Sequence, residues 1–298
     1  MKNETKKTCL AFHPYREKMR IMSFNTQGVT KDADERFPYI IESILLYLPD
    51  ILGIQEAGKK IHANVIEKIN NYYAVACDMH ENGPVNYTPI LYRMDKFNVV
   101  DAGVEWLDSR YTGTNTKSVS WAVFKCKCDN SGMQVGVVNM HGAVLSNKYI
   151  GYEETTREER HEVCTVWRVD NVRQMLGIKD RLIDEFGDMP FILMGDFNCG
   201  SDSEAYKAMI NAKLCEAETT ASDLFSSGKQ TIHEIGQLPI DGISIDHIFG
   251  TSDIIFDLYG VGNTAHDLLS SDHCPIFTDV SIEISQTSIK ESTTKEKI

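Results

Sequence analysis

The sequence lacks any run of 18 consecutive apolar residues, and its first 18 residues lack even a run of seven. The first absence argues against a membrane-spanning helix, and the second argues against a secretory signal peptide. We therefore expect a soluble protein with a cytoplasmic location, although a secreted fragment trimmed of its leader stays open. Internal repeats and low-complexity linkers are also missing between residues 19 and 284.

Cysteine pairs with the spacing of a zinc knuckle or a redox motif are missing as well. Eight cysteines are scattered through the 298 residues, and none forms a CxxC pair. Cys126 and Cys128 are separated by a single residue, which suits neither kind of site. Free, buried thiols in a reducing compartment are the expectation, and the sequence alone leaves disulfides open.

Basic residues are scarce relative to acidic ones. The 30 Lys and Arg residues stand against 43 Asp and Glu, for a formal net charge of −13. A broad surface that binds long nucleic acid needs Lys and Arg to neutralise phosphates, so this class of protein is disfavoured. A nuclease that holds a few nucleotides through a metal ion stays compatible, because a divalent cation can offset a carboxylate cluster. Alternatively, the acidity only keeps the protein soluble.

Strand-like and helical runs alternate along the chain, while residues 216–240 are polar and irregular. The pattern predicts an α/β fold with two β-sheets packed together and helices on their outer faces. We expect one domain over residues 19–284, a flexible arm at 1–18 and a disordered tail at 285–298. Strands are predicted at 19–25, 50–55, 72–78, 88–93, 97–107, 118–126, 134–140, 191–194, 243–250, 254–260 and 276–284, and helices at 34–48, 61–70, 158–186 and 204–211.

Residues 191–200, FILMGDFNCG, contain the strongest single site signal. A short apolar run that ends at Gly195 predicts a buried strand opening into a loop. Side chains alternate along extended backbone, so Asp196 and Asn198 are expected to face the same way. Their oxygen atoms would then be available to a cation or a water molecule. The alternative is a strand followed by an ordinary Asp/Asn turn.

Other predicted strands carry similar residues at or just after their ends. These residues are Asn25, Glu56, His141, Asp246, Asp272 and His273. Loops at strand ends are the usual location of sites in open α/β sheets. Carboxylate and amide oxygens are the donors that Mg²⁺ or Mn²⁺ prefers, and two histidines beside them suit phosphate-ester hydrolysis.

Six short motifs carry a resemblance to a known family. In chain order they are SFNTQG, DILGIQE, NMHG, GDFN, IDHIF and SDHCP, and they span Met19 to about Val280. In order and spacing they resemble the motifs of the endonuclease/exonuclease/phosphatase superfamily, the DNase I-like metal-dependent phosphoesterases. The resemblance implies a four-layer fold of two sheets flanked by helices, and an enzyme that depends on Mg²⁺ or Mn²⁺.

The resemblance also implies which residues hold the metal. Asn25 and Glu56 resemble the family's metal-binding pair, and Asp272 resembles its late metal-site acid. His141 resembles the histidine that donates to the scissile phosphate.

The remaining motif residues resemble groups that act on water and phosphate. Asp196 resembles the carboxylate that positions or deprotonates the attacking water, and Asn198 resembles the amide beside it that contacts phosphate. His273 resembles the second histidine on the phosphate, and Asp246 resembles the acid that holds it. A carboxylate hydrogen-bonded to imidazole fixes the tautomer and raises the imidazole pKa, so this last pairing also has a physical basis.

Substrate class is the point at which the sequence leaves alternatives. Residues 88–93, 103–107 and 120–122 resemble the branch that contains deadenylases and small bacterial members, so a monomeric nuclease acting on short or single strands is the first expectation. A phosphatase or phosphodiesterase acting on lipid headgroups or small esters is the alternative, and an inactive binding protein is the third. The loops at 108–117 and 146–157 are polar, which argues against membrane insertion.

The sequence differs from the family motifs at some positions, and it contains histidines to which no site role is assigned. Met140-His141-Gly142 replaces the usual Thr-His-Leu, and the long basic segments of the DNA-repair branch are missing. His247 is expected to point away from Asp246 because neighbouring side chains alternate. Five histidines outside the motifs, between residues 19 and 284, are expected in loops or at the surface. They are His62, His80, His161, His233 and His266, the last close enough to Asp272 to line the site.

Overall fold

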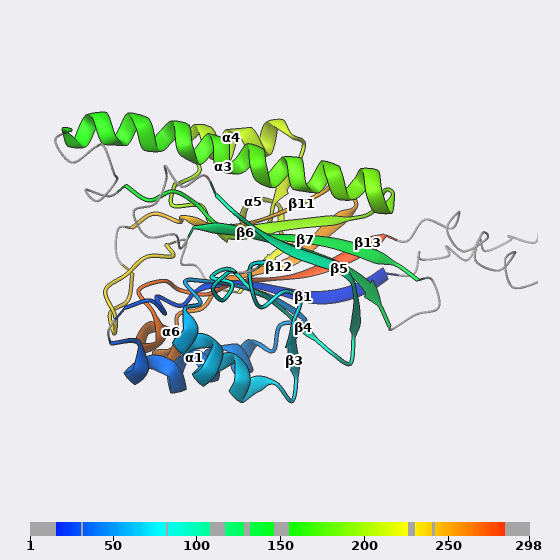
Figure 1. The fold of residues 1–298 in the computed structure, drawn as a ribbon, viewed down its shortest axis with the longest axis horizontal. Helices are drawn as coiled ribbons and strands as arrows, with labels where there is room; N and C mark the ends of the chain where they lie inside the picture. The colour runs from blue at the N-terminus through cyan, green and yellow to red at the C-terminus, as the bar shows by residue number, and fades with distance from the viewer. Residues whose placement is uncertain are drawn as a thin grey trace, which may run out of the picture.

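The structure is a computed structural model that describes residues 16–30, 32–81, 83–107, 117–127, 132–145, 155–225, 230–239 and 242–283. Within these residues two β-sheets pack face to face, and helices cover their outer faces (Figure 1). This arrangement confirms the predicted sandwich. The tail and most of the arm lie outside the described residues, so their flexibility stays a prediction, whereas residues 16–18 belong to the first strand.

The first sheet has seven strands and mixes parallel with antiparallel neighbours. In spatial order they are β10 (Asp223–Leu224), β12 (Ile254–Val261), β13 (Ile276–Glu283), β1 (Arg16–Asn25), β2 (Ile51–Gln55), β4 (Ile90–Arg93) and β3 (Tyr73–Val75). The second sheet has six strands. In spatial order they are β5 (Phe97–Trp106), β6 (Ser118–Cys126), β7 (Gln134–His141), β8 (Phe191–Asp196), β11 (Asp246–Gly250) and β9 (Cys215–Glu216).

Two long helices connect the parallel strand pairs. Helix α1 (Ala33–Tyr47) joins β1 to β2, and helix α3 (Arg157–Phe186) joins β7 to β8. Crossovers of this kind place the helix on one face of its sheet, so α1 and α3 form the two outer layers (Figure 1). The shorter helical segments are α2 (Lys59–Ile61), η1 (His62–Ile66), η2 (Glu67–Ile69), α4 (Glu204–Asn211), α5 (Ala217–Thr220) and α6 (Ala265–Ser270). None of the helices among the described residues is long and apolar enough to cross a membrane.

The core has three layers because the central strands are apolar on both faces. Ile21 of β1 packs between the two sheets, whereas its neighbour Met22 packs against α1. In the second sheet Ile192 of β8 faces the inter-sheet layer and Leu193 faces α3. Alternation along extended backbone therefore explains why these strands appear in the sequence as continuous apolar runs.

Two predicted segments differ from the structure. The helix expected at 61–70 is broken into α2, the π-turn η1 and the 3-10 turn η2, although Ile61, Val65 and Ile69 are buried as the spacing required. Apolar spacing does not distinguish these hydrogen-bonding patterns. The sequence predicts an irregular region at 216–240, yet this region contains α5 and β10, and β10 pairs with β12. Such short pieces lack the length over which periodicity can be read.

Candidate active site

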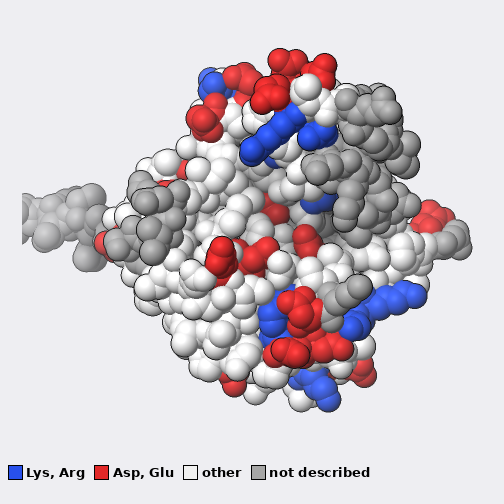
Figure 2. All heavy atoms as spheres, turned by 90° about the vertical axis from the view of Figure 1, so that its left-hand side faces the viewer, with Lys and Arg blue, Asp and Glu red and all other residues white. Residues whose placement is uncertain are grey.

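The predicted site residues lie at one end of the sandwich because of the strand directions. Asn25 ends β1, and Glu56 follows β2, its parallel neighbour. His141 ends β7 opposite Asp196, the last residue of the parallel strand β8, and Asp246 opens the antiparallel strand β11 opposite Asp196. Acidic side chains gather near the middle of the face formed by these strand ends (Figure 2).

Asp196 is the centre of the site and is 1% exposed. Its Oδ2 accepts a hydrogen bond from Asn25 Nδ2 at 2.9 Å, which links the two sheets. The same oxygen lies 3.3 Å from His141 Nε2, and Oδ1 accepts from the backbone N–H of Asn198 at 2.8 Å. Burial alone raises the pKa of Asp196, but the bound imidazole of His141 and the positive charge of His273 outweigh this effect and lower the pKa well below its usual range. Asp196 is therefore an ionised hydrogen-bond acceptor.

The backbone on either side of Asp196 packs closely against the strand β7 and the loop that follows it. Gly195 has φ +145°, and a Cβ there would collide with the carbonyl oxygen of Met140 on β7. Only glycine lets β8 approach β7 so closely at this point. Asn198 adopts a left-handed φ of 55° and donates from Nδ2 to Gly142 O at 3.2 Å. Asn198 and the loop after His141 thus lie together.

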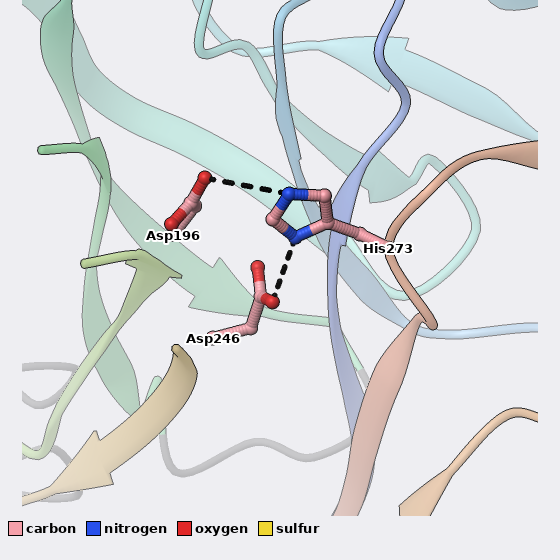
Figure 3. Close-up of side chains that lie close together, drawn as sticks. All are labelled: Asp196, Asp246 and His273. Carbon is pink, nitrogen blue, oxygen red and sulfur yellow. Dashed lines mark hydrogen bonds and ion pairs between the residues drawn. The ribbon is translucent and has the colours of Figure 1, made fainter. Parts of the chain in front are cut away.

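His273 stands between two carboxylates (Figure 3). Its Nδ1 is 2.9 Å from Asp246 Oδ2, and its Nε2 is 3.9 Å from Asp196 Oδ2. Burial lowers the pKa of His273, but the attraction and hydrogen bond of Asp246 outweigh burial and raise the pKa to about 10. The ring is therefore a cation at neutral pH, with its orientation set by Asp246.

Lys117 is a site residue that the sequence reasoning missed. Its Nζ contacts Nε2 of His141, and the side chain is buried. Burial lowers the pKa of Lys117 to about 8, while the carboxylates of Asp196 and Glu56 act in the opposite direction. Lys117 directly precedes β6, which is antiparallel to β7, so the start of β6 lies beside the end of β7 that carries His141. A search that included strand starts as well as strand ends would have found it.

The three predicted metal ligands each lie close to another residue of the site. Asn25 Oδ1 accepts from the backbone N–H of Gln27 at 3.0 Å, and Gln27 Nε2 donates to Asp272 Oδ2 at 2.7 Å. Glu56 has a left-handed φ of 58°, and its Oε1 is 3.9 Å from His141 Nε2. Burial and the charge of Glu56 both raise the pKa of Asp272. Mutual repulsion between carboxylates, with an amide oxygen nearby, fits a hard divalent cation.

A second group of ligand atoms is less suited to a metal. One atom each from Asp196, Asp246 and His273 lies within 4.8 Å of the others. His273 is protonated on both nitrogens at neutral pH, and a protonated imidazole has no lone pair for a metal. We therefore interpret Asp246 and His273 as an ion pair that faces Asp196.

Arg36 of α1 holds two of the site loops and was also missed. The guanidinium donates to the carbonyls of Thr26, Gln27 and Ser270 at 2.6–3.0 Å, and it is 5% exposed. The loop after Asn25 is thereby fixed against the segment that leads to Asp272. No local motif signals this arginine, because its acceptors are backbone atoms remote in sequence.

The remaining histidines lie outside the catalytic group, and some of their side chains are buried. His247 points away from the site, as predicted, with its nitrogens 3.0 Å from Glu216 Oε1 and from Cys199 O. His266 pairs with Glu42 on the outer surface. His80 and His233 lie in loops, as expected, although their side chains are buried. The ring of His80 stacks on Trp106 with centroids 3.6 Å apart, and Trp106 sits opposite Ser118 beside Lys117.

Comparison with known proteins gives the family and agrees with the fold. The sequence model of the Endonuclease/Exonuclease/phosphatase family matches residues 22–273, which include every residue discussed above as catalytic or metal-binding. Nocturnin of Xenopus laevis is 23% identical over 195 residues, which are 61% of this chain and 44% of that protein. The chain thus matches less than half the length of this curated relative.

Solved structures share the fold at low sequence identity. An endonuclease/exonuclease/phosphatase from Bacteroides vulgatus superposes with a TM-score of 0.70 at 23% identity and covers 90% of this chain and 100% of its own. The mannosyl-6-phosphatase of Bacteroides thetaiotaomicron gives 0.64 at 20% identity, with 88% and 99% covered. TDP2 of D. rerio in complex with a single-strand DNA product gives 0.62 at 16% identity, with 88% and 98% covered.

Proposed function

This chain belongs to the Endonuclease/Exonuclease/phosphatase family, and from that premise we propose that it hydrolyses phosphate esters with a divalent cation, Mg²⁺ or Mn²⁺. The observation that carries the proposal is the placement of Asp196. This ionised carboxylate lies within 4 Å of His141, His273 and Asn25, each from a different strand end or turn. An ionised acceptor amid phosphate-binding donors suits the positioning of a water molecule for attack.

The donor set fits the cation. Glu56, Asp272 and Asn25 would hold it through hard oxygen atoms. When bound, it supplies charge that offsets the negative phosphoryl oxygens. The assignment of these three ligands, and the choice between Mg²⁺ and Mn²⁺, are proposals.

Asp196 and the residues around it have separate roles in the proposed reaction. Asp196 orients water and accepts its proton as the water oxygen bonds to phosphorus. The bond between phosphorus and the ester oxygen then breaks, and the leaving alcohol takes a proton. His273, held charged by Asp246, and His141 with Lys117 stabilise the phosphoryl oxygens, and the amide of Asn198 contacts them.

Two substrate classes follow from the sequence. A nuclease acting on short or single strands is the first, supported by the branch resemblance and by the shared fold of the DNA-bound TDP2 structure. A phosphatase or phosphodiesterase acting on small or lipid esters is the second, supported by the fold shared with a mannosyl-6-phosphatase. An inactive binding protein would be expected to have lost some of the site residues, and every predicted position is filled. The monomeric state and cytoplasmic location stay predictions.

A substrate panel tests the proposal. Wild-type protein and Asp196→Ala are assayed in Mg²⁺ and in Mn²⁺ on single-stranded RNA, single- and double-stranded DNA, sphingomyelin, phosphoinositides and bis-p-nitrophenyl phosphate. We expect hydrolysis that the substitution lowers by about 1,000-fold or more, because it removes the water-positioning group. Asp202→Ala, at an exposed aspartate after the same strand, is the matched control and retains activity.

Chelation tests the metal separately. EDTA should abolish turnover, and added Mg²⁺ or Mn²⁺ should restore it. Turnover that survives EDTA contradicts the metal, and full activity of Asp196→Ala contradicts the role of Asp196. Metal binding without hydrolysis of any substrate would favour the inactive binding protein.

A further inference from the structure

Five aliphatic side chains form an exposed surface beside His273. They are Ile232, Ile235, Leu238, Ile243 and Leu269, and we call this surface the aliphatic shelf. Leu238 and Ile243 are each 60% exposed, and the other three are more than one third exposed. The segments that carry them are adjacent, because Thr231 N donates to Ile243 O at 3.4 Å and Gly236 N donates to Leu268 O at 2.7 Å. A clustered apolar surface of this kind marks an interaction site.

The shelf is continuous with the proposed active site. Ile232 and His273 form an antiparallel bridge, and residues paired in this way carry their side chains on the same face, about 5 Å apart at Cβ. On either side of this bridge, His233 N donates to Asp272 O at 2.9 Å and Cys274 N donates to Thr231 O at 2.7 Å. A substrate held at His273 therefore has the shelf beside it.

The shelf is built into the fold. The hydroxyl of Thr231 accepts from the backbone N–H of Ile245 at 3.1 Å, and Thr231 itself is fully buried. Gly236 adopts φ +82°, and a Cβ at this position would lie 3.7 Å from Leu269 Cδ2. The exposed aliphatic groups thus stand on segments that are hydrogen-bonded to the rest of the site.

The charge around the shelf limits what can dock there. From Gln230 to Glu283 the sequence contains several Asp and Glu residues but no Lys or Arg. A nucleic-acid strand crossing this side would find no Lys or Arg from these residues for its phosphates, because the nearby cation, His273, already pairs with Asp246, and an anionic lipid surface would meet the acids. None of the five side chains is aromatic, so the shelf offers no ring on which a base can stack. Aliphatic side chains in a stretch without Lys or Arg suit the chains of an uncharged or zwitterionic amphiphile.

We propose that the aliphatic shelf docks on the surface of a zwitterionic phospholipid aggregate and presents the headgroup phosphodiester to the site. This inference rests on the proposed hydrolytic function and names its substrate class. Water oxygen bonds to phosphorus, the bond from phosphorus to the oxygen of the acyl-bearing alcohol breaks, and that oxygen leaves with a proton on the shelf side. With phosphatidylcholine the products are phosphocholine and diacylglycerol.

The polar loops did not reveal this surface. The segments at 108–117 and 146–157, whose composition argued against membrane insertion, lie almost wholly outside the described residues. The shelf comes instead mainly from residues 232–243, where single aliphatic residues alternate with polar ones. Such a pattern contains no apolar run, and only the tertiary structure turns these side chains to the same surface.

A sedimentation assay tests docking without requiring turnover. The proteins are the wild type, the shelf variant Leu238→Asp/Ile243→Asp, and a matched control, Leu46→Asp/Val166→Asp. The control residues are exposed to a similar extent, on α1 and α3. With phosphatidylcholine vesicles, we expect wild type and control to sediment alike and the shelf variant to partition at least about tenfold less, because each lost contact removes buried apolar area. Asp196→Ala should sediment like the wild type.

A paired hydrolysis assay tests the link to the active site. Phosphocholine release from the vesicles is compared with hydrolysis of soluble bis-p-nitrophenyl phosphate in Mg²⁺ and in Mn²⁺. The ratio of vesicle to soluble hydrolysis should fall about tenfold in the shelf variant and stay unchanged in the control. Thermal unfolding of each variant verifies that it is folded. If the wild type hydrolyses no soluble ester, the proposed function is wrong. The sedimentation assay still tests whether the shelf docks on vesicles.

Three outcomes overturn the shelf proposal. The first is a wild-type protein that does not sediment with vesicles. The second is a shelf variant that sediments normally but loses hydrolysis of a single-stranded oligonucleotide, which would assign the shelf to nucleic acid. The third is a wild-type dimer in light scattering that the shelf variant dissociates, without vesicle binding, which would assign the shelf to a second copy of this chain.

Discussion

The two flanks of the site differ in charge and in exposed apolar surface. We call the group formed by Tyr87, Trp106, Lys117 and His141 the Lys117 flank. Lys117 is its buried cation, and the ring centroids of Tyr87 and Trp106 lie 6.4 Å apart. The opposite flank is the aliphatic shelf beside His273, which is exposed and belongs to a segment, residues 230–283, that contains acids but no Lys or Arg. One flank therefore supplies charge for the phosphoryl group, and the other supplies an apolar surface for the rest of the substrate.

Each flank supplies one histidine to Asp196, and the two are held differently. His273 has Asp246 at 2.9 Å, which keeps it charged. His141 has Lys117 as its contact, and its Nδ1 has no hydrogen-bond partner among the described residues. Positive charge would therefore reach a bound phosphate by two routes: an imidazolium paired with an acid, and an ammonium beside an imidazole.

Of the four substitutions described below, removal of the Asp246 carboxylate, which holds His273 charged beside the shelf, should have the largest effect. Asp246→Asn deprives His273 of its carboxylate, so the ring loses both its fixed orientation and its stabilised charge. We expect kcat for bis-p-nitrophenyl phosphate at pH 7 to fall by about 100- to 1,000-fold with a small change in KM. Asp253→Asn, on an exposed turn after the same strand, is the control. A fall of less than tenfold would show that His273 does not depend on Asp246.

The Lys117 flank should show a smaller loss that depends on substrate charge. Lys117→Ala removes an ammonium near the phosphate, so kcat/KM for p-nitrophenyl phosphate, a dianionic monoester, should fall by about 100-fold. The diester should be affected less, because it carries one negative charge. Lys125→Ala, at an exposed lysine on β6, the strand that follows Lys117, should leave both rates unchanged. Equal losses for the two esters would argue for a purely structural Lys117.

A third change tests the connection between the proposed metal side and the shelf side. Arg36→Met removes donors from buried carbonyls of Thr26, Gln27 and Ser270. Unsatisfied buried acceptors cost free energy, so the free energy of unfolding should fall by about 2–4 kcal/mol in urea denaturation. Arg173→Met, at a side chain that is 71% exposed, should change it by less than about 0.5 kcal/mol. Unchanged stability of Arg36→Met would mean that other groups hold these loops.

The smallest expected effect is a pH dependence of stability on the Lys117 flank. Burial lowers the pKa of His80, under Trp106, to about 4, whereas an unfolded histidine titrates near about 6.5. Between these values the unfolded chain binds more protons, so stability is lost as the pH falls from about 6.5 to 4. His80→Phe lacks this loss, and urea denaturation at pH 7.5 and pH 5 should show the wild type weakening relative to the variant.

The control for this titration is His161→Phe, at an exposed position on α3. It should follow the wild type at both pH values. If His80→Phe also parallels the wild type, His80 does not titrate in this range and its stack on Trp106 has another energetic role.

The sequence predicted most of the fold because its periodic segments are long. The strands that contain Ile21 and Ile192 are continuous apolar runs, and α1 and α3 repeat apolar residues at helical spacing over several turns. The short segments failed for the converse reason. β10 has two residues and exists because β12 offers it a backbone partner, which no local pattern encodes.

The site shows the same division. Asp196, Asp246 and His273 could be named from their motifs, because a strand end fixes where a side chain emerges. Lys117 and Arg36 could not, since one depends on an antiparallel neighbour and the other on carbonyls contributed by distant loops. The roles assigned to Asn25, Glu56 and Asp272 as metal ligands stay predictions, and the chelation experiment tests the metal requirement on which they depend.

By itself, the sequence determined which residues are apolar, where strands end and which polar groups stand at those ends, since these depend on local spacing. Tertiary structure alone decided that the strand ends of two sheets meet at Asp196, that His80 is buried and that five separate aliphatic residues form one shelf. The physical reason is that burial, charge coupling and exposed apolar area arise from groups far apart in the chain. Their energies are set by distance in space, which no segment of sequence specifies alone.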